Sequence, residues 1–272
     1  MSLKELIHTD IKKTGPTTSL IEIARMMRHD RIGSVFIENM ENAGKYLGIV
    51  TESDLVRKGL TKAVPIEAEA ASLMHAPLIE IDIEKSPIEA NHLMHLNGIR
   101  HLAVSEEGKV AGMISVRDLV RHFSIDKKGP LNAMGEIVKP LTVLVRREIE
   151  TIAPGATAQE AARKMDLKKI GSLLVNDHGQ YVGIVTETDL VRKVIGYGLS
   201  ASNVPVGVIM NTPIIDIDIS RTLQEANEIM AAKGVRHLAV TEGGQIIGIF
   251  SIRDLIGMIS IRDFPRFLSE KK

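Results

Sequence analysis

Four segments of the sequence place a hydroxyl side chain three residues before an aspartate, at intervals of 64 to 71 residues. They are Thr51 and Asp54, Ser115 and Asp118, Thr186 and Asp189, and Ser251 and Asp254. This spacing is typical of a helix N-terminus, where the hydroxyl caps the backbone and the carboxylate meets the positive end of the helix. A carboxylate held in this way can also accept hydrogen bonds from both hydroxyls of a ribose. The segments therefore predict four helix starts and four candidate ribose-binding groups.

The choice of aspartate distinguishes these segments from four other predicted helix starts. Those are Ser19 to Glu22, Ser86 to Glu89, Thr157 to Glu160 and Thr222 to Glu225, which follow the usual capping box with a glutamate. The hydroxyl–aspartate segments use the shorter carboxylate in all four copies. We interpret that preference as a sign of ligand contact, and the alternative is that each aspartate only caps its helix.

The whole chain consists of related repeats. Gly-Ile-Arg-His-Leu-Ala-Val at 98–104 recurs as Gly-Val-Arg-His-Leu-Ala-Val at 234–240, and Gly-Ile-Val-Thr-Glu at 48–52 recurs at 183–187. Two halves, each made of two different repeats, explain this order. The predicted repeats are residues 1–63, 64–128, 129–200 (with a linker at the start) and 201–272.

Each repeat is predicted to contain a strand, a helix, two strands and a second helix. Ile79, Ile81 and Ile83 alternate with acidic residues, as in a half-buried strand. Gly98 then ends the first helix, and a glycine-containing turn joins the next two strands. About 60 residues bury too little apolar surface to be stable alone. From the alternating order we expect each odd-numbered repeat to pack on an even-numbered one.

Basic residues distinguish the even-numbered repeats. Arg100-His101 and Arg236-His237 stand where the odd-numbered repeats have Gly33-Ser34 and Gly171-Ser172. The forked donors of arginine suit a phosphate group. The alternative is an arginine at the edge of a hairpin, in a surface ion pair of little energetic value. Further candidates of the same kind are Arg117 and Arg253, each just before an aspartate.

Composition excludes several classes of function. Lys plus Arg equals Asp plus Glu at 34 each, which argues against binding to nucleic acid or to an anionic membrane surface. Without cysteine there is no thiolate nucleophile and no cysteine-bound metal. His92 and His95 lack an evident third ligand, so no metal is expected. The N-terminus lacks the apolar run of a signal peptide, and we expect a cytoplasmic protein.

The repeats resemble CBS domains, and each half resembles a tandem CBS pair. The resemblance rests on the four Gly-Ile-Val-Thr-x-x-Asp-Leu segments or their variants and on Gly-x-Arg-His-Leu-Ala-Val, and it covers nearly the whole chain. It implies a mixed α/β (α+β) fold in which residues 1–128 and 129–272 form two intertwined pairs that assemble into a disc. Paired repeats of this family have two clefts, which often bind AMP, ATP or S-adenosylmethionine.

The resemblance also implies roles for particular residues. In the family the aspartate contacts the ribose, and the preceding Ser or Thr lies near the nucleoside. The residue two positions before that hydroxyl forms the adenine slot, although each such residue could equally be part of a core strand. Here the slot residues are Ile49, Met113, Ile184 and Ile249. A basic residue at the strand start contacts phosphate in some relatives, which favours Arg100, His101, Arg236 and His237.

These observations predict a regulatory module that is not an enzyme. It would bind an adenine nucleotide or another adenosyl compound and signal to a separate, unidentified protein partner. The alternative is a structural or oligomerisation scaffold with empty clefts. The basic pairs favour phosphorylated ligands over S-adenosylmethionine, whose sulfonium gains nothing from arginine. One chain already holds four repeats, although two chains could form a homodimer.

Overall fold

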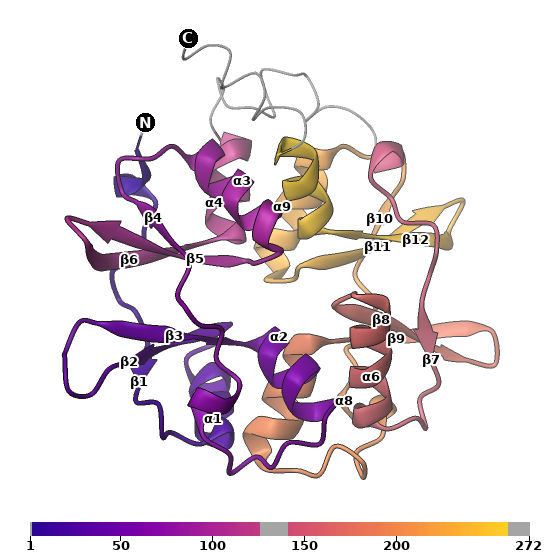
Figure 1. Ribbon diagram of the computed structural model, residues 1–272. Coiled ribbons are helices and arrows are strands. Elements are labelled where there is room, and N and C mark those ends of the chain that lie inside the picture. The colour runs from indigo at the N-terminus through magenta and orange to yellow at the C-terminus, as the bar shows by residue number, and fades with distance from the viewer. Residues whose placement is uncertain (1, 126–140, 261–272) are drawn as a thin grey trace. The chain divides into compact units, whose positions relative to one another are not determined.

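The computed structural model describes residues 2–125 and 141–260, and within them each predicted repeat forms one three-stranded sheet (Figure 1). The first strand of each sheet is parallel to the second, and the second is antiparallel to the third. The strands are β1 (Lys13–Thr14), β2 (Ser34–Glu38), β3 (Tyr46–Thr51), β4 (Glu80–Asp82), β5 (His101–Glu106), β6 (Lys109–Ser115), β7 (Thr151–Ile152), β8 (Ser172–Asp177), β9 (Gln180–Thr186), β10 (Asp216–Asp218), β11 (His237–Glu242) and β12 (Gln245–Ser251). The mixed α/β class and the predicted strand–helix order are confirmed.

The first helix of each repeat joins the two parallel strands. These helices are α1 (Leu20–His29), α3 (Pro87–Asn97), α6 (Ala158–Lys168) and α9 (Leu223–Lys233). All four begin with the predicted hydroxyl–glutamate capping box, in which each side chain satisfies a backbone N–H of the other residue.

The second helix of each repeat starts directly after the last strand, at the hydroxyl–aspartate segment. In the odd repeats it begins as α2 (Glu52–Asp54) and α7 (Glu187–Asp189), which continue as π-helical turns over Leu55–Leu60 and Leu190–Val194. In the even repeats it comprises α4 (Val116–Ile125) and the helical residues 252–260. Shorter elements are α8 (Val206–Ile209) and the 3₁₀ turns at Leu3–Glu5, Ala70–Ser72, Leu141–Val143 and Ile195–Tyr197.

The chain divides into two compact units that join repeats of the same parity. The even unit takes the described residues within 1–10, 79–149 and 215–272, and the odd unit takes 11–78 and 150–214. The second repeat thus packs with the fourth, and the first with the third. The expectation that each odd-numbered repeat packs on an even-numbered one is therefore wrong for these units, which join repeats of like number. The predicted boundaries of the repeats and the disc remain predictions.

The segment ahead of the first strand of each repeat crosses to the neighbouring repeat, where one residue bridges the last strand. These exchange segments are named here by their bridging residues, His8, His75, Arg146 and Asn211, which pair with Met113, Ile49, Ile249 and Ile184. Each bridge has two backbone hydrogen bonds of 2.8 to 3.1 Å. The first and second repeats therefore exchange segments, as do the third and fourth, and the predicted intertwining of tandem repeats is confirmed.

A glycine permits each of these bridges. A Cβ atom at Gly48 would lie 2.5 Å from the carbonyl oxygen of His75, and one at Gly248 would lie 2.6 Å from that of Arg146. Real Cβ atoms do not approach that closely, so the glycine before each slot residue is a requirement of the exchange.

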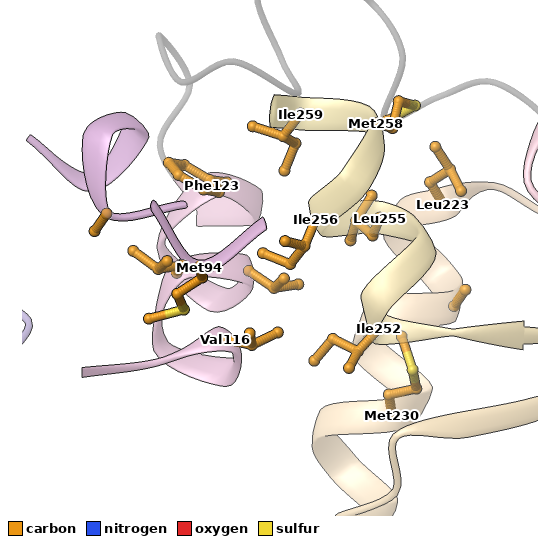
Figure 2. Packing of buried hydrophobic residues seen from close by; sticks show 14 of the residues in the cluster. Met94, Val116, Phe123, Leu223, Met230, Ile252, Leu255, Ile256, Met258 and Ile259 are labelled. Atoms are coloured by element: carbon orange, nitrogen blue, oxygen red, sulfur yellow. The ribbon is translucent and has the colours of Figure 1, made fainter. Parts of the chain in front are cut away.

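The core of the even unit is apolar where its two repeats meet. Figure 2 shows Val116 and Phe123 of the second repeat facing Ile252 and Ile256 of the fourth, and all four side chains are buried. Burial of apolar area dominates this contact, and the amide of Asn91 adds a buried hydrogen bond to the carbonyl of Ile256.

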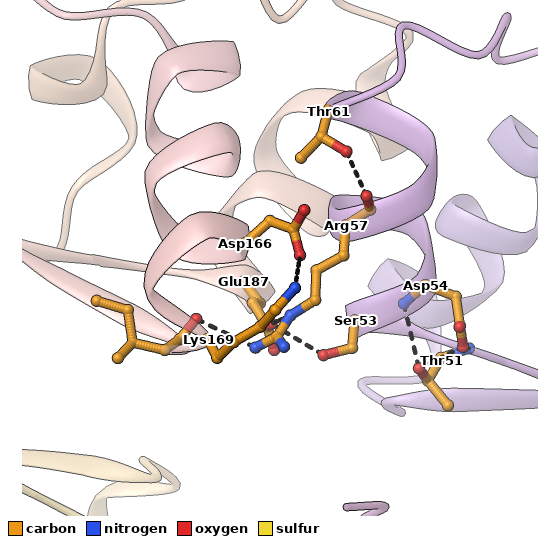
Figure 3. A network of polar contacts seen from close by, with 9 residues as sticks. Thr51, Ser53, Asp54, Arg57, Thr61, Asp166, Lys169 and Glu187 are labelled. Carbon is orange, nitrogen blue, oxygen red and sulfur yellow. Dashed lines mark hydrogen bonds and ion pairs between the residues drawn. The ribbon is translucent and has the colours of Figure 1, made fainter.

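The odd unit instead buries two ion pairs. Figure 3 shows one of them: Arg57 Nε donates to Glu187 Oε1 over 3.0 Å, and Ser53 Oγ donates to the same oxygen over 2.9 Å. The second pair joins the equivalent residues of the two repeats, with a terminal nitrogen of Arg192 in place of Nε. Arg192 lies 3.3 Å from Glu52, which also accepts from Thr188 over 3.0 Å. Both glutamates are at most 1% exposed.

This difference explains the parity of the packing. The position of Glu52 and Glu187 is occupied by Val116 and Ile252 in the even repeats. If an odd repeat packed its second helix on an even one, a buried carboxylate would face an aliphatic side chain. An uncompensated buried charge of that kind costs about 3–5 kcal/mol.

Removal of one arginine should therefore destabilise the protein strongly. Arg57→Ala leaves Glu187 buried without its ion pair, and we expect the free energy of unfolding to fall by about 3–5 kcal/mol. Chemical denaturation measures this loss, with Arg163→Ala on the exposed side of α6 as the matched control. A loss for Arg57→Ala no larger than that of the control would contradict the assignment of a buried, structurally important pair.

Lys169 offers a substitution that should stabilise the fold. It ends α6 in the left-handed conformation, with φ of 55°, where the even repeats have Gly98 and Gly234 at 63° and 67°. Lys169→Gly relieves backbone strain of about 1 kcal/mol and loses only an exposed ion pair with Asp166. We expect a gain of roughly 0.5–1 kcal/mol in the same denaturation assay. Gly234→Ala should instead lower the free energy of unfolding, because it places a Cβ in the left-handed conformation.

Candidate functional site

The four aspartates are fixed by the residue that precedes each helix. In every repeat Asp Oδ2 accepts from the backbone N–H of the hydroxyl residue over 2.8 to 3.0 Å and from its hydroxyl over 2.5 to 2.6 Å. The predicted pairing of hydroxyl and carboxylate is thus confirmed at Thr51 and Asp54, Ser115 and Asp118, Thr186 and Asp189, and Ser251 and Asp254. It holds each carboxylate at the junction of strand and helix.

The second carboxylate oxygen of each aspartate meets a nitrogen-bearing side chain. In the odd repeats this is the lysine four residues later: Lys58 lies 2.7 Å from Asp54, and Lys193 lies 2.9 Å from Asp189. The aspartate–lysine spacing is visible in both copies of Asp-Leu-Val-Arg-Lys, and it is the signal that could have identified these residues.

In the even repeats this partner side chain comes from an exchange segment. His8 Nε2 lies 2.8 Å from Asp118 Oδ1, and Arg146 Nε lies 2.8 Å from Asp254 Oδ1. In the third repeat, Asn211 at the equivalent position of its exchange segment donates a side-chain N–H to Asp189, in addition to the contact from Lys193. These residues were not among the sequence candidates, since His8 and Arg146 stand 110 and 108 positions from their aspartates. Only the backbone bridges bring them together.

The predicted slot residues lie on the strand that leads to each hydroxyl. Ile49 is buried, and Met113, Ile184 and Ile249 are half-buried. Each is two residues before its hydroxyl, and so both side chains are on one face of the strand. Each also bridges an exchange segment through its backbone. The structure therefore groups an apolar side chain, a fixed carboxylate and an exchange-segment residue in every repeat, and the adenine role itself stays a prediction.

The arginine–histidine pairs lie at the same end of the sheet as the aspartates. His101 is in register with Ser115, and His237 with Ser251. The carbonyl of Arg100 accepts from the first helical residue, Val116, over 2.9 Å, and that of Arg236 accepts from Ile252 over 3.1 Å. Each even repeat thus places two basic residues next to its hydroxyl–aspartate segment. Contact with phosphate remains a prediction for them.

The two other arginine candidates stand beside the aspartates on the helices. Arg117 donates to the backbone carbonyl of Gly234, at the end of α9, over 3.0 Å. That bond links the second and fourth repeats, so the structure gives Arg117 a role in the packing of the even unit. Arg253 is half-buried in the first turn of its helix, and its predicted phosphate contact stays a prediction.

His92 is explained by packing. Its Nδ1 lies 2.9 Å from the hydroxyl of Ser260, while burial and, secondarily, the nearby His95 lower its pKa. Within residues 2–125 and 141–260, no group of three or more His, Asp or Glu side chains could hold a metal ion. No helix in the same ranges combines the length and apolar character that a membrane span needs.

Comparisons with known proteins identify the repeats. The CBS domain matches at residues 3–60, 70–125, 138–196 and 206–261. A protein of Methanopyrus kandleri, MK0525, is 36% identical over 115 residues, which are 42% of this chain and 59% of the relative. MJ1404 of Methanocaldococcus jannaschii is 25% identical over 272 residues, or 93% of this chain and 61% of the relative. The chain thus spans about 60% of the length of these two relatives.

A solved structure shows the same fold over almost the whole chain. The crystal structure of protein MJ1225 from Methanocaldococcus jannaschii superimposes with a TM-score of 0.78 at 20% identity, covering 95% of this chain and 99% of the other. Each of the four matched segments contains one of the four three-stranded sheets and its capped helices. The chain belongs to the CBS domain family, with four CBS domains in two tandem pairs.

Proposed function

We propose that this chain is a non-catalytic regulatory module that binds adenosine-containing ligands at its hydroxyl–aspartate segments. One observation carries the proposal: in every repeat an apolar side chain lies on the same strand face as the hydroxyl residue, two positions before it, and that hydroxyl residue holds the aspartate carboxylate at the start of the helix. The carboxylate suits the hydroxyls of a ribose, and the apolar side chain suits the face of a base. Membership of the CBS family supports this assignment.

The even repeats add a reason to expect phosphorylated ligands. Arg100 and His101, or Arg236 and His237, lie at the same sheet end as the aspartate and would pair with a phosphate. AMP, ADP or ATP therefore suits these sites better than S-adenosylmethionine. The bound state would be passed to a separate protein partner, and the proposal assigns no catalytic step to the chain.

A scaffold without ligand is the second candidate. It is favoured by the capping contacts, since each aspartate already stabilises a helix start through its Ser or Thr. In that case the aspartates would serve stability alone.

Thermal unfolding against a panel of ligands tests the proposal. The panel is AMP, ADP, ATP, NAD, S-adenosylmethionine and cyclic di-AMP, with GTP as the control. A ligand at about 100 times its dissociation constant adds roughly 2.7 kcal/mol per site, which raises the unfolding temperature by several degrees. A shift with adenosyl compounds but not with GTP is expected. No shift, together with no nucleotide released from the denatured protein, would favour the scaffold.

A single substitution separates binding from capping. Asp54→Asn keeps an acceptor for the backbone of Thr51 but removes the charge. Loss of a charge-assisted hydrogen bond of about 1.5–3 kcal/mol should weaken binding at that site at least tenfold. Calorimetric titration with the ligand that gives the largest thermal shift measures the change. Glu22→Gln, in the capping box of the same repeat, is the control. Equal binding by both variants would leave Asp54 with capping alone.

A further inference from the structure

The four aspartates differ in how many hydrogen bonds they already accept. A carboxylate offers about four acceptor positions. Asp54 accepts two hydrogen bonds from Thr51 and one contact from Lys58. Asp118 accepts two from Ser115 and one from His8. Among the described residues, each of these two carboxylates therefore keeps one acceptor position, which is enough for one of the two ribose hydroxyls.

The aspartates of the second tandem pair have all their positions filled. Asp254 accepts two hydrogen bonds from Ser251 on Oδ2, while Arg146 places Nε at 2.8 Å and a terminal nitrogen at 2.7 Å from Oδ1. Asp189 accepts two from Thr186, and Lys193 lies against its Oδ1. The amide of Asn211 lies 2.9 Å from both oxygens of Asp189.

Exposure follows the same division. The side chains of Asp118 and Asp54 are 20% and 12% exposed, against 9% and 6% for Asp254 and Asp189. The two aspartates with a remaining acceptor position are thus also the two more accessible ones.

One position in the exchange segments accounts for the difference. Arg146 and Asn211 each direct side-chain N–H groups at the carboxylate, as the hydroxyls of a ribose would. The guanidinium bond of Arg146 to its carboxylate is about twice as strong as a neutral one, so a ribose hydroxyl would not displace it without loss. At Asp189 the amide of Asn211 is neutral, and it fills the site together with the charged Lys193. His75, at the equivalent position beside the first repeat, has an exposed side chain, and the structure shows no contact between it and Asp54.

We propose that Arg146 and Asn211 close the sites at Asp254 and Asp189, so that ligand binds at Asp54 and Asp118 only. This inference rests on the proposed function and adds which sites fill. The first tandem pair is the ligand-binding half, and the second carries the same segments with the chain's own side chains in the place of a ligand. Arg146 and Asn211 are then the residues that determine how many ligands one chain takes.

Calorimetric titration of the full chain with AMP tests this. The wild-type protein should bind two AMP molecules. Asp54→Asn and Asp118→Asn should each remove one, whereas Asp189→Asn and Asp254→Asn should leave the number at two. Arg146→Ala and Asn211→Ala should each add one, with the exposed neighbour Arg147→Ala as the matched control. Unfolding temperatures without ligand verify that each variant is folded.

The outcomes separate the inference from the proposed function. Four AMP molecules bound by the wild type, or one lost in Asp189→Asn or Asp254→Asn, would overturn the inference and leave the proposed function standing. The same holds if Arg146→Ala and Asn211→Ala bind no more AMP than Arg147→Ala does. No AMP bound by the wild type or by any folded variant would contradict AMP binding itself, and the inference with it. The number of AMP molecules bound by the wild type, and its change in the Asp→Asn variants, test the inference without Arg146→Ala and Asn211→Ala.

Discussion

The rest of the structure depends on one interaction, the backbone bridge that joins each exchange segment to the last strand of the neighbouring repeat. Each bridge consists of two backbone hydrogen bonds. It requires a glycine at 48, 112, 183 and 248, because a Cβ atom there would lie 3.0 Å or less from the carbonyl oxygen of the bridging residue. The bridge fixes the register between segment and strand, and thereby brings His8, Arg146 and Asn211 to an aspartate. The candidate sites thus depend on contacts made by residues far from the hydroxyl–aspartate segments in sequence.

The two units achieve helix packing by different chemistry. The odd unit buries Glu52 and Glu187, each with an arginine from the other repeat, and the even unit packs Val116 and Ile252 in their place. Buried ion pairs add little net stability compared with apolar packing, but they penalise a wrong partner severely. Four repeats with similar backbones need such a distinction, because their shapes alone would permit several pairings.

Much of the local structure could be predicted from the sequence because its determinants lie within a few residues of each other. Patterns that span three to seven positions predict the glutamate capping boxes, the strand order and the start of the second helix in each repeat. The repeat order followed from identity between the halves. Lys169 departs from the local rule, since the left-handed helix end that glycine occupies in the even repeats is occupied here by a side chain with a Cβ.

The remaining features depend on contacts between distant positions. Arg57 and Glu187 are 130 residues apart, and nothing near either residue indicates the other. The contrast between Glu52 and Val116 at one repeat position is visible in the sequence, and compared across all four repeats it would have favoured packing of like with like. The partners of Asp118 and Asp254 offered no such contrast, because an exposed histidine or arginine ahead of the first strand of a repeat has no pattern of its own.

The exchange of segments also sets an order of assembly during synthesis. All residues of the odd unit have been made once residue 214 is added, whereas the even unit needs residues from both the first ten and the last sixty of the chain. Its Arg146 must wait for Ile249, more than one hundred residues later. Pairing of such distant segments is slow, and domains generally fold as they are completed. All residues of the odd unit are therefore available before those of the even unit, whose fourth repeat is the last part of the chain to be made.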